Sequence, residues 1–310
     1  MPLPLPTFRA LALPGPLLGV DIGGSSAKIV LVPRAADGTL GEPVEQRRWP
    51  LAPGAGVPEL LDELRRVAGR TPVGGVGLSV PGVVDSSGSH VVRATNVPWL
   101  EGPGLLPRVS DALDAPVTLV NDGEAFALAE ARLGPGADHD DVLVLALGTG
   151  VAGAHVVHGR VRRGAHGAAG ELGHLALDPG GPMCSCGQRG CLETSIGAAN
   201  LARRWREAGG PANGDAEALA DATRTGDATA VSVTRQANHA FARALLHAVT
   251  LLDPGLVVVG GGLAQAPDVY VEPAVALARE WATFQTVPAV LPAALGAWAG
   301  ARGAALAAAR

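Results

Sequence analysis

The chain has 310 residues, a length that suggests about two domains. Apolar residues make up 47% of it and aromatic residues only 3%, so the core must consist mainly of Leu, Val and Ala. The net charge of −5 provides no basic field for a nucleic acid or an anionic membrane. No apolar run reaches the roughly 18–20 residues of a membrane span, and the prolines of residues 1–16 exclude a signal peptide. We therefore expect a cytoplasmic protein without nucleic-acid or membrane partners, in which residues 1–16 form a flexible leader.

Strand and helix patterns alternate along the chain from residue 17 onward. Residues 17–32 read as an apolar run, a Gly pair and a second apolar run, which predicts two strands joined by a tight turn. Short apolar runs predict further strands at 73–80, 117–120, 142–147, 154–157 and 256–259. Apolar residues at helical spacing predict helices at 57–70, 105–113, 124–133, 198–208, 216–225, about 228–252 and about 300–309. Residues 164–193 are rich in Gly, Pro and Cys and are expected to form a loop.

The pattern of strand, Gly turn and strand occurs twice, near residues 19–32 and near residues 143–157. Further strand and helix patterns follow each copy. The repetition indicates a weak internal duplication of two α/β halves. Strands that alternate with helices predict mixed α/β layers rather than an all-α or all-β fold.

The first Gly turn has the sequence D-I-G-G-S-S and starts at Asp21. Gly23 and Gly24 permit positive φ and let backbone N–H groups approach a phosphate. Asp21 could hold a hydrated Mg²⁺ ion, and Lys28, the one lysine of the chain, could reach a phosphate. An ordinary hairpin turn accounts for the same residues, so the turn alone does not distinguish a phosphate-binding site from a simple connection between strands.

The second Gly turn, at residues 148–153, has the G-x-G-x-x-G spacing of a dinucleotide-binding fingerprint. Such a turn must open a helix, whereas residues 154–161 alternate like a hairpin. We therefore expect a second phosphate-binding hairpin rather than the cofactor site of a nicotinamide dehydrogenase. A third Gly turn, at residues 260–262, would let the backbone lie flat against a planar ligand such as adenine, although it is by itself only a turn.

Asn121 and Asp122 stand at the end of a predicted strand, just before a helix. Asp at this place is often a helix N-cap. A carboxylate at the mouth of two phosphate-binding turns could instead act as a general base toward a substrate hydroxyl. The sequence leaves both roles open.

The three cysteines, Cys184, Cys186 and Cys191, lie within eight residues of one another. An odd number of cysteines argues against a disulfide framework. Together with His174 they supply three thiolates and one imidazole, a closed tetrahedral shell for a structural Zn²⁺ ion. The alternative is three unligated thiols and a solvent-facing histidine. Glu171 and Glu193 bracket this loop, either as surface carboxylates or as ligands of sugar hydroxyls.

From about Gly19 to its C-terminus the chain resembles the ROK family of sugar kinases and sugar-responsive repressors. The most specific motifs are G-A-H-G-A-A-G-E-L-G-H at 164–174 and C-S-C-G-Q-R-G-C-L-E at 184–193. The resemblance implies the actin-like ATPase fold, in which two RNase H-like α/β domains surround a cleft. We expect a small domain of residues 17–121 and about 293–310, and a large domain of residues 122–292 that carries the zinc loop 164–193.

The resemblance also implies an ATP-dependent kinase that phosphorylates the 6-hydroxyl of a hexose, with glucose as the first expectation. ATP with Mg²⁺ would contact Asp21, Gly23, Gly24, Ser25, Lys28, Gly148, Thr149, Gly150, Gly260, Gly261 and Gly262. The sugar would contact Asn96, Asn121, Asp122, Glu171, His174 and Glu193. Asp122 would take the proton from the attacking hydroxyl, and His174 would join Cys184, Cys186 and Cys191 on zinc while its other ring nitrogen meets the sugar. The family also implies a homodimer or homotetramer.

Two departures from the family pattern leave alternatives open. The second turn reads G-T-G-V-A-G-A, with Ala152 and Ala154 where the family often has Gly, so an idle sugar-binding relative remains possible. The first turn reads G-G-S-S-A-K, a spacing similar to that of polyphosphate-using glucokinases; those relatives generally lack the cysteine loop, so ATP is the favoured donor. Kinases for N-acetylmannosamine, N-acetylglucosamine or another hexose are further alternatives. A ROK repressor would carry a DNA-binding domain before the first turn, where about 16 residues stand here.

Overall fold

The computed structural model describes residues 14–52, 54–94 and 97–309, so most of the expected leader at 1–16 lies outside the described residues. The chain divides into two compact units, which we call unit 1 (Met1–Ala129 and Gly296–Arg310) and unit 2 (Glu130–Leu295). The division falls inside helix α3 (Asp122–Arg132). Within the described part of the chain, no helix is long and apolar enough to cross a membrane.

The sheet of unit 1 has five strands in the order β3-β2-β1-β4-β7. Strands β1 and β2 form the predicted antiparallel hairpin and β3 extends it, while β1, β4 and β7 run parallel. A separate short pair, β5 and β6, follows β4. The strands of this unit are β1 (Leu17–Ile22), β2 (Ser26–Val32), β3 (Glu45–Pro50), β4 (Gly75–Val80), β5 (Val83–Val84), β6 (Val91–Arg93) and β7 (Val117–Asn121).

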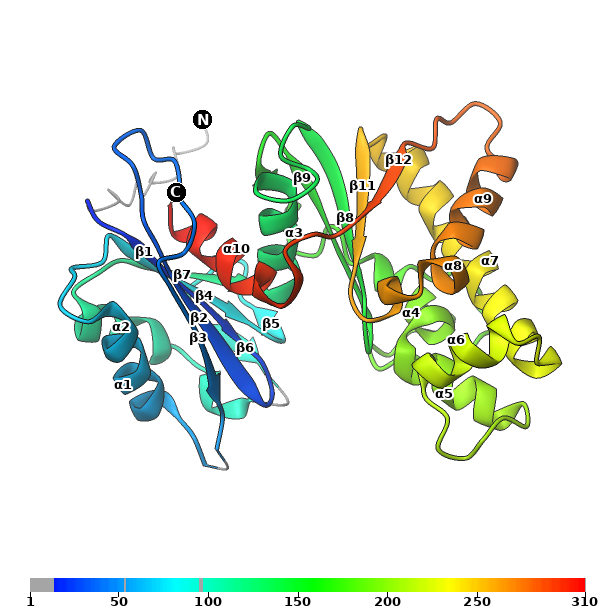
Figure 1. Cartoon of the computed structure of the whole chain (residues 1–310), viewed down its shortest axis with the longest axis horizontal. Coiled ribbons are helices and arrows are strands. Elements are labelled where there is room, and N and C mark those ends of the chain that lie inside the picture. The colour runs from blue at the N-terminus through cyan, green and yellow to red at the C-terminus, as the bar shows by residue number, and fades with distance from the viewer. Residues whose placement is uncertain (1–13, 53, 95–96, 310) are drawn as a thin grey trace, which may run out of the picture. The chain divides into compact units, whose positions relative to one another are not determined.

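Helices cover both faces of this sheet (Figure 1). Helices α1 (Val57–Ala68) and α2 (Leu105–Leu113) bury their leucines and valines on one face, against Leu18 and Val20. Helix α10 (Ala299–Ala308) covers the other face. Its backbone comes so close that a Cβ atom on Gly77 would lie 1.8 Å from the carbonyl oxygen of Ala304. Small residues on both surfaces therefore permit a contact that larger side chains would exclude.

The sheet of unit 2 has five strands in the order β10-β9-β8-β11-β12. Strands β8, β9 and β10 are antiparallel neighbours, whereas β8, β11 and β12 run parallel. This is the pattern of unit 1 repeated strand for strand, so the predicted duplication is confirmed. The strands are β8 (Asp141–Leu147), β9 (Val151–Val157), β10 (Arg160–Val161), β11 (Leu256–Gly260) and β12 (Ala289–Pro292).

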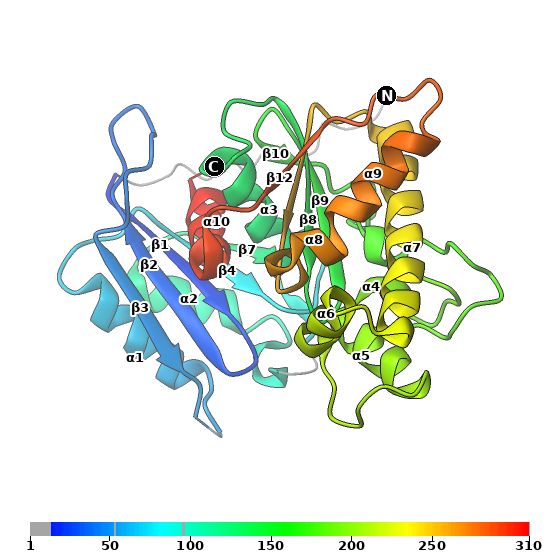
Figure 2. The ribbon, with the colours of Figure 1, turned by 45° about the vertical axis from the view of Figure 1, so that its right-hand side comes forward.

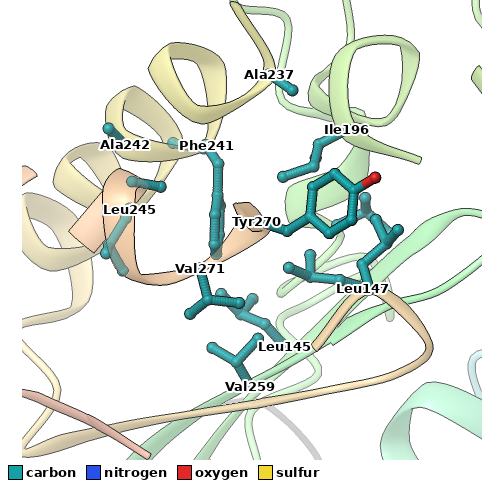
Figure 3. Close-up of a cluster of buried hydrophobic side chains, with 14 of the residues drawn as sticks. Leu145, Leu147, Ile196, Ala237, Phe241, Ala242, Leu245, Val259, Tyr270 and Val271 are labelled. Atoms are coloured by element: carbon teal, nitrogen blue, oxygen red, sulfur yellow. The ribbon is translucent and has the colours of Figure 1, made fainter. Parts of the chain in front are cut away.

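Six helices lie on one side of this second sheet (Figure 1): α4 (Leu192–Ile196), α5 (Ala198–Glu207), α6 (Ala216–Arg224), α7 (Ala228–Leu252), α8 (Pro267–Tyr270) and α9 (Glu272–Trp281). The long helix α7 lies beside α9 (Figure 2). In the core, Phe241 of α7 reaches toward Leu145 and Val259 of the sheet (Figure 3). Tyr270 lies in the same apolar cluster, between Ile196 and Leu147. This packed core fixes the ends of β8 and β11, where the Gly turns begin.

The sequence patterns do not predict strands β3, β5, β6 and β12 or helices α4, α8 and α9. Strand β3 reads E-Q-R-R-W-P and has no apolar alternation, because it is an edge strand with mostly exposed side chains. Strand β12 is likewise an exposed edge strand. The expected loop at 164–193 contains one short 3-10 helix, Leu172–His174, and reaches the first residues of α4.

Candidate functional site

The carboxyl ends of β1, β4 and β7 lie at one edge of the sheet of unit 1, because these strands are parallel. Asp21 of β1 stands next to Ser79 of β4 in the ladder, and Asn121 ends β7. Ligands of open α/β sheets bind at this kind of edge. The sequence-predicted residues of unit 1 are therefore brought to one edge by the topology.

Asp21 is held by two neighbours on this edge. The Ser79 hydroxyl donates to Asp21 Oδ1 at 2.9 Å, and Lys28 Nζ lies 3.1 Å from Asp21 Oδ2. Lys28 stands directly opposite Asp21 in the β1–β2 hairpin. A Cβ atom on Gly300, in the first turn of α10, would lie 2.6 Å from Asp21 Cγ. The carboxylate thus rests against a helix N-terminus, whose partial positive charge favours an anion.

The tip of the same hairpin carries the first Gly turn. Gly23 N–H donates to the carbonyl of Ser26 at 2.9 Å, and the carbonyl of Ser25 accepts from Leu51 at 3.0 Å. Gly24 and Ser25 are exposed. The turn is therefore tied at its base while its tip faces solvent.

Asn121 and Asp122 join β7 to α3. The Asn121 side chain donates from Nδ2 to the carbonyl of Gly82 at 2.8 Å and accepts from the Gly123 N–H at 2.8 Å. Asp122 is exposed, and its Oδ1 also accepts from the Gly123 N–H, at 2.9 Å. Asn121 thus fixes the start of the helix from which Asp122 projects. Asn96, the other predicted sugar ligand of this part of the chain, lies outside the described residues.

In unit 2 the second Gly turn connects β8 to β9. The Gly148 N–H donates to the carbonyl of Gly150 at 2.9 Å, and β9 then pairs antiparallel with β8. The turn opens a hairpin rather than a helix, which confirms the prediction against a dinucleotide fingerprint. Ala152 and Ala154 lie inside β9, after the turn, opposite Ala146 and Val144.

A cavity of about 730 Å³ adjoins this turn within unit 2. Its lining joins the predicted Gly148, Thr149 and Gly262 to residues that the sequence reading misses. These additional residues are Ala198, Asp215, Ala216, Glu217, Ala220, Asp221, Arg224, Leu263, Gln265, Ala266 and Tyr270. Five of these eleven residues come from α6, which has no motif and is brought here only by packing.

The third Gly turn closes the end of β11 beside this cavity. Gly261 has φ +90°, and a Cβ atom there would lie 2.3 Å from the carbonyl oxygen of Leu147. Only glycine fits that position. Gly260 is buried at the end of β11, whereas a Cβ atom on Gly262 would meet no atom within 4 Å.

Charged side chains also line the cavity. Arg224 pairs with Asp221 at 2.9 Å and with Asp268 at 2.7 Å, and the Asp268 hydrogen bonds raise the pKa of Arg224. The Tyr270 hydroxyl donates to the carbonyl of Ala216 at 2.6 Å, and burial raises its pKa. The positive charge of Arg224 is therefore neutralised by its two partners, and the lining is acidic through Asp215 and Glu217.

The cysteine loop brings its four predicted ligands together. The donor atoms of His174, Cys184, Cys186 and Cys191 all lie within 4.8 Å of one another. The Cys186 and Cys191 sulfurs are 3.6 Å apart, and Cys184 Sγ is 3.7 Å from His174 Nδ1. Tetrahedral zinc with one imidazole and three thiolates places its ligand atoms roughly 3.5–3.8 Å apart. The donor set therefore fits such an ion, and these two distances match the spacing that it requires.

The protonation of these thiols differs with their surroundings. Burial raises the pKa of Cys191 to about 12, whereas a backbone hydrogen bond from Gln188 lowers the pKa of Cys186. A buried thiol of this kind binds a metal only by giving up its proton, so a cation must offset the cost of burying its charge. Gln188 also donates to the carbonyl of His174 at 2.9 Å, which ties the two halves of the loop.

The two glutamates that bracket the loop have different surroundings. Glu171 is exposed at the start of the 3-10 helix that carries His174. Glu193, in α4, accepts the Val151 N–H on its Oε2 at 2.9 Å. Its carboxylate thus lies against the second Gly turn.

Comparison with known proteins identifies similar chains over nearly the whole length. A family model described as ROK family matches residues 17–310. A glucokinase of Thermotoga maritima is 33% identical over 272 residues, which cover 83% of this chain and 85% of that protein. An N-acetyl-D-glucosamine kinase of Mannheimia succiniciproducens is 30% identical over 93% of this chain and 98% of its own length.

Solved structures give the same result. The ROK hexokinase from Thermus thermophilus is 34% identical, with a TM-score of 0.84 over 94% of this chain and 97% of its own. A ROK family glucokinase from Streptomyces griseus, in complex with glucose and AMPPNP, is 29% identical. Its TM-score is 0.73 over 95% of this chain and 99% of that chain. With these neighbours, the duplicated sheets are those of the actin-like ATPase fold.

Proposed function

The chain belongs to the ROK family, and from this premise we propose that it is an ATP-dependent hexokinase that phosphorylates the 6-hydroxyl of glucose. The observation that carries the proposal is the Gly-lined cavity of unit 2, at the carboxyl ends of two parallel strands. Such an edge is where nucleotides bind in α/β folds. Relatives that act on N-acetylated sugars make N-acetylglucosamine and N-acetylmannosamine the alternative substrates.

We expect ATP to fit this cavity better than polyphosphate does. The Gly148 N–H is used within the turn, so the backbone of Thr149 would meet the phosphates, whereas much of the remaining lining is apolar or acidic. Asp215 and Glu217 would repel a long polyanion but accept hydrogen bonds from a base or a ribose. The Arg224 charge is already engaged by Asp221 and Asp268. The lining therefore favours a donor with three phosphates and a neutral nucleoside.

Asp122 is the proposed general base. Its exposed carboxylate at the start of α3 would take the proton of the 6-hydroxyl as that oxygen attacks the γ-phosphorus. Asn121 would bind the sugar with the amide hydrogen and lone pair that Gly82 and Gly123 do not use. Its fixed orientation would limit the sugar to one pose, since phosphoryl transfer depends mainly on positioning.

Asp21 is the proposed ligand of Mg²⁺, directly or through water. Mg²⁺ prefers one or two carboxylates together with water and phosphate oxygens, and it neutralises charge on the transferred phosphoryl group. Lys28 and Ser79 would keep the Asp21 carboxylate oriented. The exposed N–H groups of Gly24 and Ser25, at the tip of the turn, would be directed to the phosphates, since the Gly23 N–H is used within the turn.

The cysteine loop is proposed to hold structural zinc through His174, Cys184, Cys186 and Cys191. All four positions of a tetrahedron are then occupied by protein, so the ion would shape the loop without entering the reaction. The remaining ring nitrogen of His174, together with Glu171, would contact the sugar. Metal analysis of the purified protein tests this assignment, with one zinc per chain as the expected result.

The test of the proposed function is sugar-dependent ADP release. Purified protein with MgATP is assayed against glucose, mannose, N-acetylglucosamine and N-acetylmannosamine, with Asp122→Asn as the inactive control. Glucose is expected to give the highest kcat/KM, and polyphosphate is expected not to replace ATP. Absence of turnover with every sugar from folded, zinc-loaded protein would contradict the assignment. If another sugar has the highest kcat/KM, the assignment as a sugar kinase stands and the proposed substrate changes to that sugar.

A further inference from the structure

The second Gly turn is held by the segments that carry two of the proposed metal ligands. On one side, Glu193 Oε2 accepts the Val151 N–H at 2.9 Å, and Glu193 stands two residues after Cys191. On the other side, Gly173, which precedes His174, packs so closely that a Cβ atom on it would lie 2.0 Å from the Val151 carbonyl oxygen. Val151 is therefore in contact with both halves of the cysteine loop, the half that carries His174 and the half that carries Cys191.

Glu193 lies so close to the turn that a side chain at position 150 would have to displace its carboxylate. A Cβ atom on Gly150 would lie 2.3 Å from Glu193 Oε2. The same helix end supports the turn at a second point, because the Ala198 N–H donates to the carbonyl of Gly148 at 2.9 Å. The turn that lines the nucleotide cavity thus rests on the junction between α4 and α5.

Glu193 itself is fixed in place. Its carbonyl accepts from the Gly197 N–H at 2.9 Å and from Asn200 Nδ2 at 3.0 Å. A carboxylate on a fixed backbone forms a stronger, more directional hydrogen bond to an N–H than a neutral acceptor on a flexible side chain would. The Val151 N–H follows the three residues of the Gly148–Gly150 turn, so this bond determines where the turn ends.

From these contacts we propose that Glu193 is a positioning residue for the nucleotide: its carboxylate holds the Gly148–Val151 turn in the form that receives phosphates, and it couples this turn to the metal-binding loop. The proposal rests on the proposed function and extends it. Loss of zinc would loosen Cys191 and His174, and through Glu193 and Gly173 it would loosen the turn. Zinc then affects nucleotide affinity as well as the sugar site.

The test measures binding of MgAMPPNP without sugar by calorimetry. Glu193→Ala is expected to weaken binding about tenfold, since it removes a charged acceptor of a backbone N–H. Glu193→Gln keeps an acceptor oxygen and is expected to remain within about threefold of the wild type. Glu207→Ala, which removes an exposed carboxylate in α5, is the matched control and is expected to bind like the wild type. Circular dichroism checks that each variant is folded.

The second part of the test removes zinc and measures the same nucleotide affinity. Chelation is expected to weaken MgAMPPNP binding in the wild type about tenfold, but several-fold less in Glu193→Ala, where only the Gly173 contact still links the loop to the turn, because the coupled pair behaves non-additively. Equal nucleotide affinity of Glu193→Ala and the wild type would overturn the proposal. Unchanged nucleotide affinity with weaker sugar binding in both Glu193 variants would assign the residue to the sugar alone.

Amide hydrogen exchange of the peptide around Val151 tests, in the absence of any ligand, whether Glu193 and zinc order the turn. The Val151 amide is expected to be protected in the zinc-loaded wild type and to exchange faster after chelation or in Glu193→Ala. Protection that survives both changes would overturn the proposal. If the wild type binds no MgAMPPNP, the proposed function fails, and the exchange result alone decides whether Glu193 orders the turn.

Discussion

The two units have sheets of the same strand order, but different types of residue stand at the carboxyl edges of the two sheets. At the edge of unit 1 stand side chains that carry charge or donate hydrogen bonds, among them Asp21, Asn121 and Asp122. At the edge of unit 2 stand glycines, such as Gly148 and Gly261, that expose backbone instead. In the proposed function, one topology therefore gives an edge for proton and metal chemistry and an edge for a flat ligand and its phosphates.

The difference also appears in what each edge tolerates. The Asp21 carboxylate pairs with Lys28 and accepts a hydrogen bond from Ser79, so what its surroundings require at this position is a negative charge. Gly261 lies against the Leu147 carbonyl, so its environment depends on space. Substitutions at the first edge should therefore change rate more than stability, and substitutions at the second should change nucleotide affinity or folding.

The largest expected effect comes from Asp122→Asn. This change removes the proposed base but keeps the shape of the side chain, so kcat should fall about 10³-fold with little change in either KM. ADP release at saturating sugar and MgATP measures it. Asp111→Asn, at an exposed position of α2, is the matched control and should retain full activity. Wild-type kcat in Asp122→Asn would remove the base from the proposal.

Gly77→Ala tests the close approach of α10 to the sheet of unit 1. The new methyl would collide with the Ala304 backbone, and the free energy of unfolding should fall by about 3 kcal/mol. Urea unfolding measures the change. Gly104→Ala, in the same unit, places its Cβ atom within 4 Å of nothing and should be nearly neutral. Equal stability of the two variants would contradict the packing of α10.

Asp21→Asn should lower kcat about 100-fold and raise the Mg²⁺ concentration needed for half-maximal activity, because a neutral amide replaces the proposed metal ligand. A magnesium titration at fixed ATP measures both. Lys28→Met separates the two possible roles of the lysine. If Lys28 only orients Asp21, its loss should cost less than that of Asp21; an equal or greater loss of kcat would assign Lys28 to the phosphates.

The smallest expected effect is that of Gly262→Ala. Its methyl would enter the cavity without meeting protein, so stability should change by less than about 0.5 kcal/mol while the KM for ATP rises about threefold. Gly261→Ala, one residue earlier, should instead be strongly destabilised, since its φ is +90° and its space is filled. Thermal unfolding and ATP kinetics on the pair measure both. A Gly262→Ala variant with an unchanged KM would place the nucleotide elsewhere.

The elements that the sequence predicts are those whose own residues carry the pattern. The strands of the hairpin 17–32 and strand β8 are nearly continuous apolar runs because both of their faces are buried, whereas helix α1 is apolar at helical spacing because one of its faces is buried. Strand β3 escapes prediction because an edge strand with the sequence E-Q-R-R-W-P needs no apolar face. Helix α9 buries mainly small residues, Ala274 and Ala278 among them, whose helical spacing is a weak signal.

The residues of the candidate site likewise divide into those that the sequence predicts and those that it does not. The Gly turns and the four residues of the cysteine loop are visible because their chemistry concentrates in short motifs. The contributions of Asp215, Gln265 and Tyr270 to the cavity are not, since no local pattern distinguishes them and only tertiary packing brings them there. The contact of Glu193 with Val151 is hidden for the same reason, as the two residues are 42 positions apart.

Helix α10 completes the core of unit 1 although it follows all of unit 2 in the chain. On the ribosome, the sheet face of Leu17, Val30 and Val32 therefore stays uncovered until residues 299–308 have emerged. Unit 2 has by then been fully synthesised and can fold without waiting. The order of synthesis is thus the reverse of the order of completion: the part of the protein that is made first is the last to close its core.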